Sequence, residues 1–272
     1  MLELLQYSFF RNAVIGILIL SIAAGIIGTY IVTRRLVSLS GGITHSCFGG
    51  LGFGYYLGVN PIVMALIFAV ASSLGIEWMS SRQKVREDSA IGLVWALGMA
   101  IGIMFIFLTP GYAPELNSFL FGNLLTITTT DLWLSGTYTV TLILFFGIFN
   151  RKIIACAFDS DFATVTGLPV RLFNSIMTVM VAICIVLTIR MVGIMLLISM
   201  LTVPVLIAEI RNHSFNHIMT AAIIISAISC LGGIFLGTVI DVPCSAIIVL
   251  LQVVIFAIAR SYHTFRMRRM MQ

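Results

Sequence analysis

Charged residues are scarce in this chain of 272 residues: they make up 9% of it, whereas hydrophobic residues make up 60%. Soluble domains carry about 25% charged residues, so the composition excludes an ordinary soluble protein. Apolar runs of helical length recur instead, and about 20 apolar residues span the ~30 Å hydrocarbon core of a bilayer. Lipid offers no partner to an unpaired backbone group. The sequence therefore predicts an all-α, polytopic bundle of transmembrane helices.

Several chemical motifs are also missing. No G-x-x-x-x-G-K-[ST] sequence occurs, so we expect no nucleotide-binding loop, and no H-E-x-x-H sequence occurs, which argues against an intramembrane metalloprotease. The five cysteines form no C-x-x-C pair, so no disulfide framework is expected. No carboxylate lies in the middle of an apolar run, where a transporter driven by protons or sodium needs one. An ion-driven secondary transporter is therefore the weaker alternative.

Nine apolar runs are candidate membrane spans. They are residues 13–33, 40–58, 61–80, 90–108, 132–149, 172–189, 191–209, 218–238 and 243–260. The segment 109–131 is ambiguous, because its moderately apolar middle suits an external helix, a re-entrant element or a poor span. We therefore expect eight to ten spans, in a single transmembrane domain over residues 1–272.

The positions of the basic residues predict the topology. Of the 15 lysines and arginines, all except Arg11 and Arg190 can be placed on one side of the membrane. Basic residues concentrate in cytoplasmic loops. We therefore expect the N-terminus outside and the C-terminus in the cytoplasm. The formal charge of +5 has this explanation without a nucleic acid partner.

Small residues repeat every four positions in the second apolar run. On a helix they form one face, which lets helix backbones approach closely in lipid. Tight packing alone would explain such a face, and the functional alternative is a narrow translocation route. The candidate residues for route and packing are Gly41, Gly42, Thr44, Ser46, Gly50 and Gly54.

His45 is the only histidine within a predicted span. An ionisable residue inside the membrane is a functional candidate, here a transient ligand of a metal ion. Its helical neighbours Gly41 and Gly49 supply no second ligand on that face. The alternative is a neutral histidine that hydrogen-bonds to a neighbouring helix.

The polar segment 150–171 predicts a short helix between two spans. An acid near the helix start suits the positive end of the helix dipole, and glycine followed by proline stops a helix. The helix could be an ordinary interfacial helix or a docking element for a soluble partner. The candidate coupling residues are Asp159, Asp161, Ala163, Gly167 and Pro169.

Four segments in order carry a resemblance to a known family. They are Arg34–Leu39 followed by Thr44–Ser46, then Ser118–Leu125 (SFLFGNLL), Phe158–Pro169 (FDSDFATVTGLP) and Val192–Pro204 (VGIMLLISMLTVP). With them the chain resembles the permease subunits of bacterial ATP-binding-cassette importers for zinc, manganese or iron(II). The resemblance runs through most of the chain.

The resemblance implies a type II importer-like permease in the bacterial cytoplasmic membrane. It would act as a homodimer with two cassette ATPase chains, fed by an extracytoplasmic metal-binding protein. The cargo would be a divalent metal ion, with no permanently bound cofactor and no enzymatic role for this chain. In the family, an acid-Ala-Ala-x-x-x-Gly loop docks the ATPase, and an aspartate commonly precedes the histidine by four residues. Here that position is Gly41, so an importer for a metal chelate or a cofactor remains an alternative.

Overall fold

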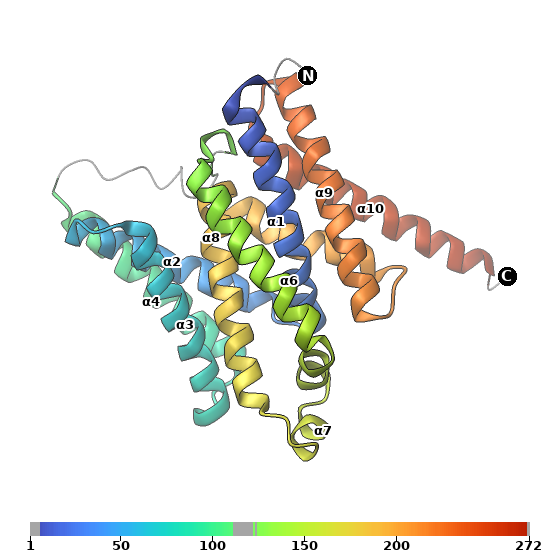
Figure 1. The fold of residues 1–272 in the computed structure, drawn as a ribbon, viewed down its shortest axis with the longest axis horizontal. Coiled ribbons are helices and arrows are strands. Elements are labelled where there is room, and N and C mark those ends of the chain that lie inside the picture. Colours follow the sequence, from blue (N-terminus) through green and yellow to red (C-terminus); the bar gives the residue numbers. More distant parts are fainter. Residues whose placement is uncertain (1–5, 111–121, 123, 271–272) are drawn as a thin grey trace. The chain divides into compact units, whose positions relative to one another are not determined.

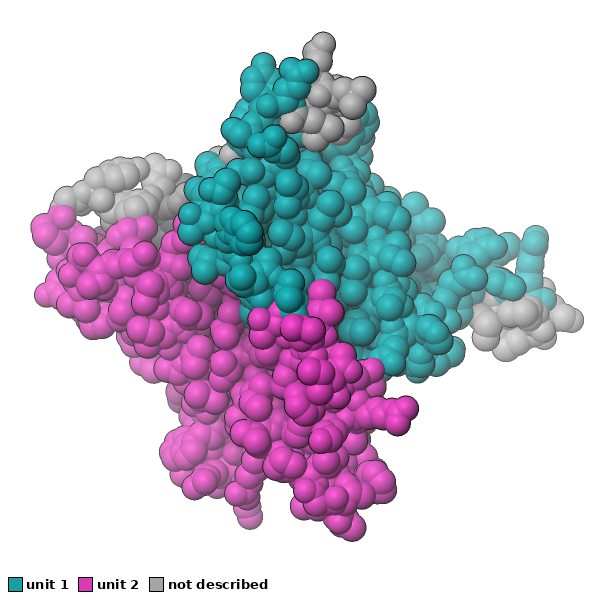
Figure 2. All heavy atoms as spheres, viewed as in Figure 1, with its two compact units in different colours: residues 1–33, 117–140, 191–272 teal, residues 34–116, 141–190 magenta. Residues whose placement is uncertain are grey.

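The computed structural model describes residues 6–110, 122 and 124–270. Helices make up almost all of this part, and no strand occurs in it (Figure 1). The predicted all-α membrane fold is confirmed. By their contacts the residues fall into two compact units (Figure 2). Unit 1 comprises residues 1–33, 117–140 and 191–272, and unit 2 comprises residues 34–116 and 141–190.

Unit 1 is built around helix α1 (Ser8–Thr33), most of whose residues are buried. Its other helical parts are η2 (Leu124–Thr126), the start of α6 (Thr129–Phe158), the end of α8 (Val170–Glu209), α9 (Phe215–Ile240) and α10 (Cys244–Met270). Helix α9 packs closely on α1 at Gly25, where a Cβ atom would lie only 3.0 Å from the Ile223 Cα. Small residues allow such backbone contacts in lipid.

Buried polar side chains join three helices of unit 1. Ser199 of α8 donates a hydrogen bond of 2.6 Å to Gln252 Oε1 on α10, and Gln252 Nε2 donates one of 3.1 Å to Ser229 Oγ on α9. All three residues are buried. Hydrogen bonds between membrane helices contribute on average about 0.6 kcal/mol. The network therefore helps to hold these three helices together.

Helix α2 (Val37–Leu57) is the centre of unit 2 and packs against both α3 (Pro61–Gln83) and α4 (Glu87–Leu108). It ends at Gly58, which has a left-handed φ of 67°. Helix α3 starts at once, because the Asn60 side chain accepts a 3.0 Å hydrogen bond from the Ile62 N–H. The unit also contains the end of α6, the short helix α7 (Ser160–Val165) and the start of α8.

Seven helices in the described part are long and apolar enough to cross a membrane. Helix α2 is not among them, since its many glycine and serine residues lower its hydropathy. Helix α8 has 40 residues, and a straight helix of that length would measure about 60 Å, twice the hydrocarbon thickness. It is interrupted at Gly193, whose φ of 78° and ψ of 172° are not helical. The two parts correspond to the spans predicted at 172–189 and 191–209.

Several helix ends differ from the predicted boundaries. Residues 150–158 belong to α6 instead of a loop, because no glycine or proline interrupts the helix before Asp159 caps the next one. Helix α10 continues ten residues past the predicted end at 260, to Met270, since arginine and methionine are good helix formers. The ambiguous segment 109–131 lies largely outside the described residues, and its described end contains η2 and the first residues of α6.

Candidate functional site

The glycines predicted to form a route lie on α2 and contact its neighbours within unit 2. A Cβ atom on Gly42 would lie 2.7 Å from Ile91 Cγ2 of α4, and one on Gly50 would lie 2.7 Å from the Ala65 Cα of α3. Gly54 also faces α3. Positions four apart drift by about 40° around a helix, so the small face turns from α4 toward α3. These glycines are therefore packed against helices, and a role in a translocation route stays a prediction.

Thr44 and Ser46 use their hydroxyl groups on their own helix. Thr44 Oγ1 donates a hydrogen bond of 2.6 Å to the Ser40 carbonyl, and Ser46 Oγ donates one of 2.8 Å to the Ile43 carbonyl. Both side chains are buried. A hydroxyl that bonds to the preceding turn is satisfied without a partner on another helix. These two side chains are therefore compatible with the close contact between α2 and α4.

His45 is half-buried and stacks on Trp95 of α4. The ring centroids are 4.2 Å apart and the ring planes differ by 8°. A Cβ atom on Gly41 would lie 3.5 Å from Trp95 Cζ3, an ordinary contact distance. One indole ring therefore covers a face of the imidazole and also lies beside Gly41. This contact could not be predicted from the sequence, because the two rings are on different helices.

The described residues contain no group of three or more histidine, cysteine, aspartate or glutamate side chains that could hold a metal ion. His45 can therefore supply one imidazole ligand but not a closed site, which for zinc usually has four ligands. A translocation route must release its cargo, so weak ligation suits transport better than storage. Whether His45 touches a metal stays a prediction.

The predicted coupling residues form a helix with well-defined ends. Asp159 caps α7, since its Oδ1 accepts a 2.9 Å hydrogen bond from the Phe162 N–H. At the other end Gly167 has a left-handed φ of 80°. The Gly167 N–H donates to the Thr164 carbonyl at 3.0 Å. The Leu168 N–H donates to the Ala163 carbonyl at 2.9 Å. These two bonds form a Schellman motif, which satisfies the last carbonyls of the helix.

Helix α7 exposes a ridge of apolar side chains. Phe162 is 60% exposed and Val165 is 88% exposed. Their spacing of three residues places them on one face of α7, whereas Ala163 is fully buried. An exposed apolar face on a short helix between two spans is a candidate interaction surface. We call Phe162 and Val165 the α7 ridge.

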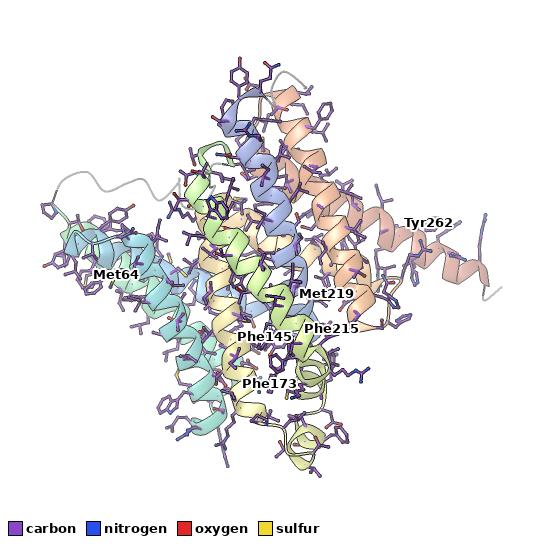
Figure 3. The ribbon with its side chains drawn as sticks, in the orientation of Figure 1. Met64, Phe145, Phe173, Phe215, Met219 and Tyr262 are labelled. Atoms are coloured by element: carbon purple, nitrogen blue, oxygen red, sulfur yellow. The ribbon has the colours of Figure 1, made fainter. Side chains whose placement is uncertain are left out.

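An aromatic cluster fixes the two helices that flank α7. Phe149 of α6 packs against Phe145 of the same helix and Phe173 of α8, with ring centroids 5.3 Å and 5.8 Å away. Figure 3 labels Phe145 and Phe173 in this part of unit 2. Aromatic pairs at such distances contribute about 0.5–1.5 kcal/mol beyond their buried area. The α7 ridge is therefore carried on a firmly held support.

The α7 ridge was missed as a functional feature by the reasoning from sequence. The acid, the alanine, the glycine and the proline were singled out there, whereas the apolar residues between them were left without a role. The available signal was the spacing of Phe162 and Val165 in a polar segment, where an apolar helical face has no hydrophobic core of its own to pack against. Asp161 is exposed in the first turn of α7, and Pro169 directly precedes α8.

Comparison with known proteins places this geometry in a family. The model of the ABC 3 transport family matches residues 6–263. A "probable metal transport system membrane protein" of Chlamydia trachomatis serovar D is 34% identical over 238 residues, which cover 85% of this chain and 81% of that protein. The "manganese transport system membrane protein MntC" of Halalkalibacterium halodurans is 30% identical over 257 residues, which cover 94% and 88%.

A solved structure is also similar to this chain. PsaBC from Streptococcus pneumoniae, solved in complex with Fab, is similar with a TM-score of 0.83 and 25% sequence identity, over 95% of this chain and 93% of that chain. The match extends over nearly the whole length of both chains. The chain belongs to the ABC 3 transport family.

Proposed function

We propose that this chain is the permease subunit of an importer that moves a divalent metal ion across the bacterial cytoplasmic membrane, with manganese as the first candidate. The family and the names of the relatives from Chlamydia and Halalkalibacterium support metal transport. The chain is a transport subunit and not an enzyme, and a separate subunit hydrolyses ATP. The metal is cargo.

The observation that carries the mechanism is the α7 ridge. Phe162 and Val165 are exposed apolar side chains that a partner surface could cover, and the short helix that bears them is anchored at both ends. We infer that the cassette ATPase binds the α7 ridge in a cleft. Movement of the ATPase on ATP binding would then be transmitted through α7 to α6 and α8. Both helices pass on the motion because Phe149 and Phe173 join them near α7.

The remaining parts of the proposal follow from the sequence. The permease acts as a homodimer with two ATPase chains, and an extracytoplasmic binding protein delivers the metal. The α7 end of unit 2 faces the cytoplasm, together with the C-terminus, as the basic residues predict. His45 contacts the metal in passing. The small residues of α2 keep this helix close to α3 and α4 along the route. They are Gly41, Gly42, Thr44, Ser46, Gly50 and Gly54.

The experiment is uptake of radioactive manganese by vesicles that contain the permease, its cassette ATPase and its binding protein. We expect uptake that requires ATP, with unlabelled zinc and iron(II) as competitors that rank the metals. Val165→Asp places a charge on the α7 ridge and should abolish ATP-dependent uptake while the protein remains in the membrane. Phe265→Asp is the matched control, since Phe265 is also an exposed apolar residue, at 59%, but belongs to α10 in unit 1.

Two results would contradict the proposal. Normal uptake by Val165→Asp would show that the ATPase does not use the α7 ridge. Absence of uptake of all three metals by the intact complex, with uptake of a chelate instead, would reject the free ion as cargo.

A further inference from the structure

A polar cavity opens at the end of unit 2 where α3 ends and α4 and α8 begin. Its volume is about 430 Å³. Its charged lining residues are Arg34, Glu77, Arg82, Glu87 and Arg171. Three arginines against two glutamates give the cavity both signs of charge. A ligand that carries both signs therefore fits it better than a simple anion or cation.

Some of these groups are already paired within unit 2. Arg34 Nη1 donates a 3.3 Å hydrogen bond to Asn174 Oδ1, and Ser175 Oγ donates a 3.0 Å hydrogen bond to Glu77 Oε1. The other carboxylate oxygen of Glu77 is buried and accepts no hydrogen bond from any described residue. A buried acceptor without a donor destabilises the folded state, and more so when the group is charged. A hydrogen-bond donor from the cavity would remove this effect.

Two further arginines with exposed side chains line the cavity, Arg82 on α3 and Arg171 at the start of α8. Neither makes a hydrogen bond or ion pair with another residue of the described chain. The planar guanidinium group of arginine matches the oxygens of a phosphate, which it binds through two parallel hydrogen bonds. Each of these two side chains can therefore offer such a pair of donors to a phosphate group in the cavity.

An apolar stripe on α3 leads to the same cavity. The exposed residues Val63, Ile67, Leu74 and Trp78 lie along one side of the helix. The stripe is about 22 Å long at 1.5 Å per residue. Leu74 and Trp78 are also part of the cavity lining. Tryptophan is enriched at the level of lipid headgroups, so the stripe fits an acyl chain and the cavity fits the headgroup above it.

We propose that unit 2 binds one phosphatidylethanolamine molecule at this site. The phosphate lies between Arg82 and Arg171, the ammonium group donates to the free carboxylate oxygen of Glu77, and an acyl chain follows the α3 stripe past Trp78. The lipid fills the space between α3 and the start of α8. It thereby stabilises the position of these two helix ends. The site does not depend on which metal is carried.

Native mass spectrometry of the full-length chain in detergent tests the site. The probes are phosphatidylethanolamine, phosphatidylcholine and phosphatidylglycerol with the same acyl chains. We expect phosphatidylethanolamine to be retained best, since the choline group cannot donate a hydrogen bond and glycerol carries no positive charge. Glu77→Gln should lower its retention to the phosphatidylcholine level. Arg82→Gln with Arg171→Gln should weaken binding of all three lipids by about fivefold for each arginine.

The double variant Arg151→Gln with Arg211→Gln is the matched control, because it removes two exposed arginines that do not line the cavity. It should retain phosphatidylethanolamine as the unaltered chain does. Arg82→Lys with Arg171→Lys keeps the charge but loses the paired hydrogen bonds of the guanidinium groups, so retention should fall between that of the unaltered chain and that of the glutamine variant.

Three outcomes would overturn the proposal. Equal retention of the three lipids would show that the headgroup is not recognised. Preferred retention of phosphatidylglycerol would indicate an anion site without a role for Glu77. Displacement of the lipid by soluble phosphoethanolamine at equal concentration would show that the α3 stripe adds nothing and that the ligand is a free phosphate ester.

Discussion

Replacement of Gly167 tests whether the shape of α7 is needed for ATPase binding. Gly167 has a φ of 80° and closes the Schellman motif at the end of the helix. The substitution Gly167→Val places a β-branched residue in this left-handed conformation. A Cβ atom at this position would meet no heavy atom within 4 Å. The variant therefore changes the backbone preference without a steric clash.

The magnitude follows from the conformational cost. An L-residue with a side chain loses about 1–2 kcal/mol in the left-handed helical region. If the turn opens to avoid this cost, the hydrogen bonds from the N–H groups of Gly167 and Leu168 are lost, and the α7 ridge loses its fixed direction. Either route weakens ATPase binding by roughly 5- to 30-fold, since about 1.4 kcal/mol is a factor of ten in Kd.

The assay is binding of the purified cassette ATPase to the full-length permease in lipid nanodiscs. Gly167→Asn is the matched control, because asparagine tolerates the left-handed conformation and should bind the ATPase nearly as glycine does. Unchanged affinity of Gly167→Val would refute the reasoning. An equal loss in Gly167→Asn would also refute it, because the effect would then come from the added side chain and not from its φ.

The other predictions concern packing, topology and the metal route. Gly50→Ala should lower the free energy of unfolding by about 1–3 kcal/mol, because the added Cβ would overlap the α3 backbone. Gly75→Ala is the control, since a Cβ at that position meets no heavy atom within 4 Å. Equal melting temperatures of the two variants would contradict the close contact between α2 and α3. A cysteine introduced by Asp241→Cys should react with an impermeant reagent in intact cells, and one introduced by Arg266→Cys only after permeabilisation; the reverse pattern would overturn the orientation. His45→Ala and His45→Gln should both reduce manganese uptake strongly at unchanged assembly, whereas near-normal uptake by His45→Gln would leave His45 only a packing role. With Trp78→Phe and Trp133→Phe, Trp95 remains as the single tryptophan, and manganese should quench its emission in that chain but not after His45→Ala.

The transmembrane helices were predictable because their cause is local. An apolar run of about 20 residues has no other stable place than the bilayer, and its backbone must form a helix there. The ends were less predictable, because a helix continues past the hydrocarbon until a residue stops it. Asp159 stops α6 by capping the next helix, whereas the predicted stop at 149 rested on polarity alone. Capping chemistry locates an end better than hydropathy does.

Helix α7 shows the same difference between features with a local cause, which the sequence predicts, and features that depend on distant residues. Asp159 and Gly167 act on their own backbone, so their roles in α7 could be derived from the sequence. The support of α7 could not, because it depends on the contact between Phe149 and Phe173, which are separated by the whole of α7. The use of the α7 ridge is a further step away. In the function proposed above it depends on another protein, whose surface the sequence of this chain does not describe.

The pair His45 and Trp95 explains why a missing residue is hard to interpret from sequence. The glycine at position 41 stands where the family commonly has an aspartate, and the sequence alone does not show what lies beside the imidazole there. In unit 2 the indole of Trp95 lies there, at 3.5 Å from the place of a Gly41 Cβ and 4.2 Å from the His45 ring centroid. A carboxylate at position 41 would have to compete with the indole for this space. A carboxylate at position 41 would add a second metal ligand, but it would also disturb the ring stacking that orients His45. Position 41, His45 and Trp95 therefore have to be considered together.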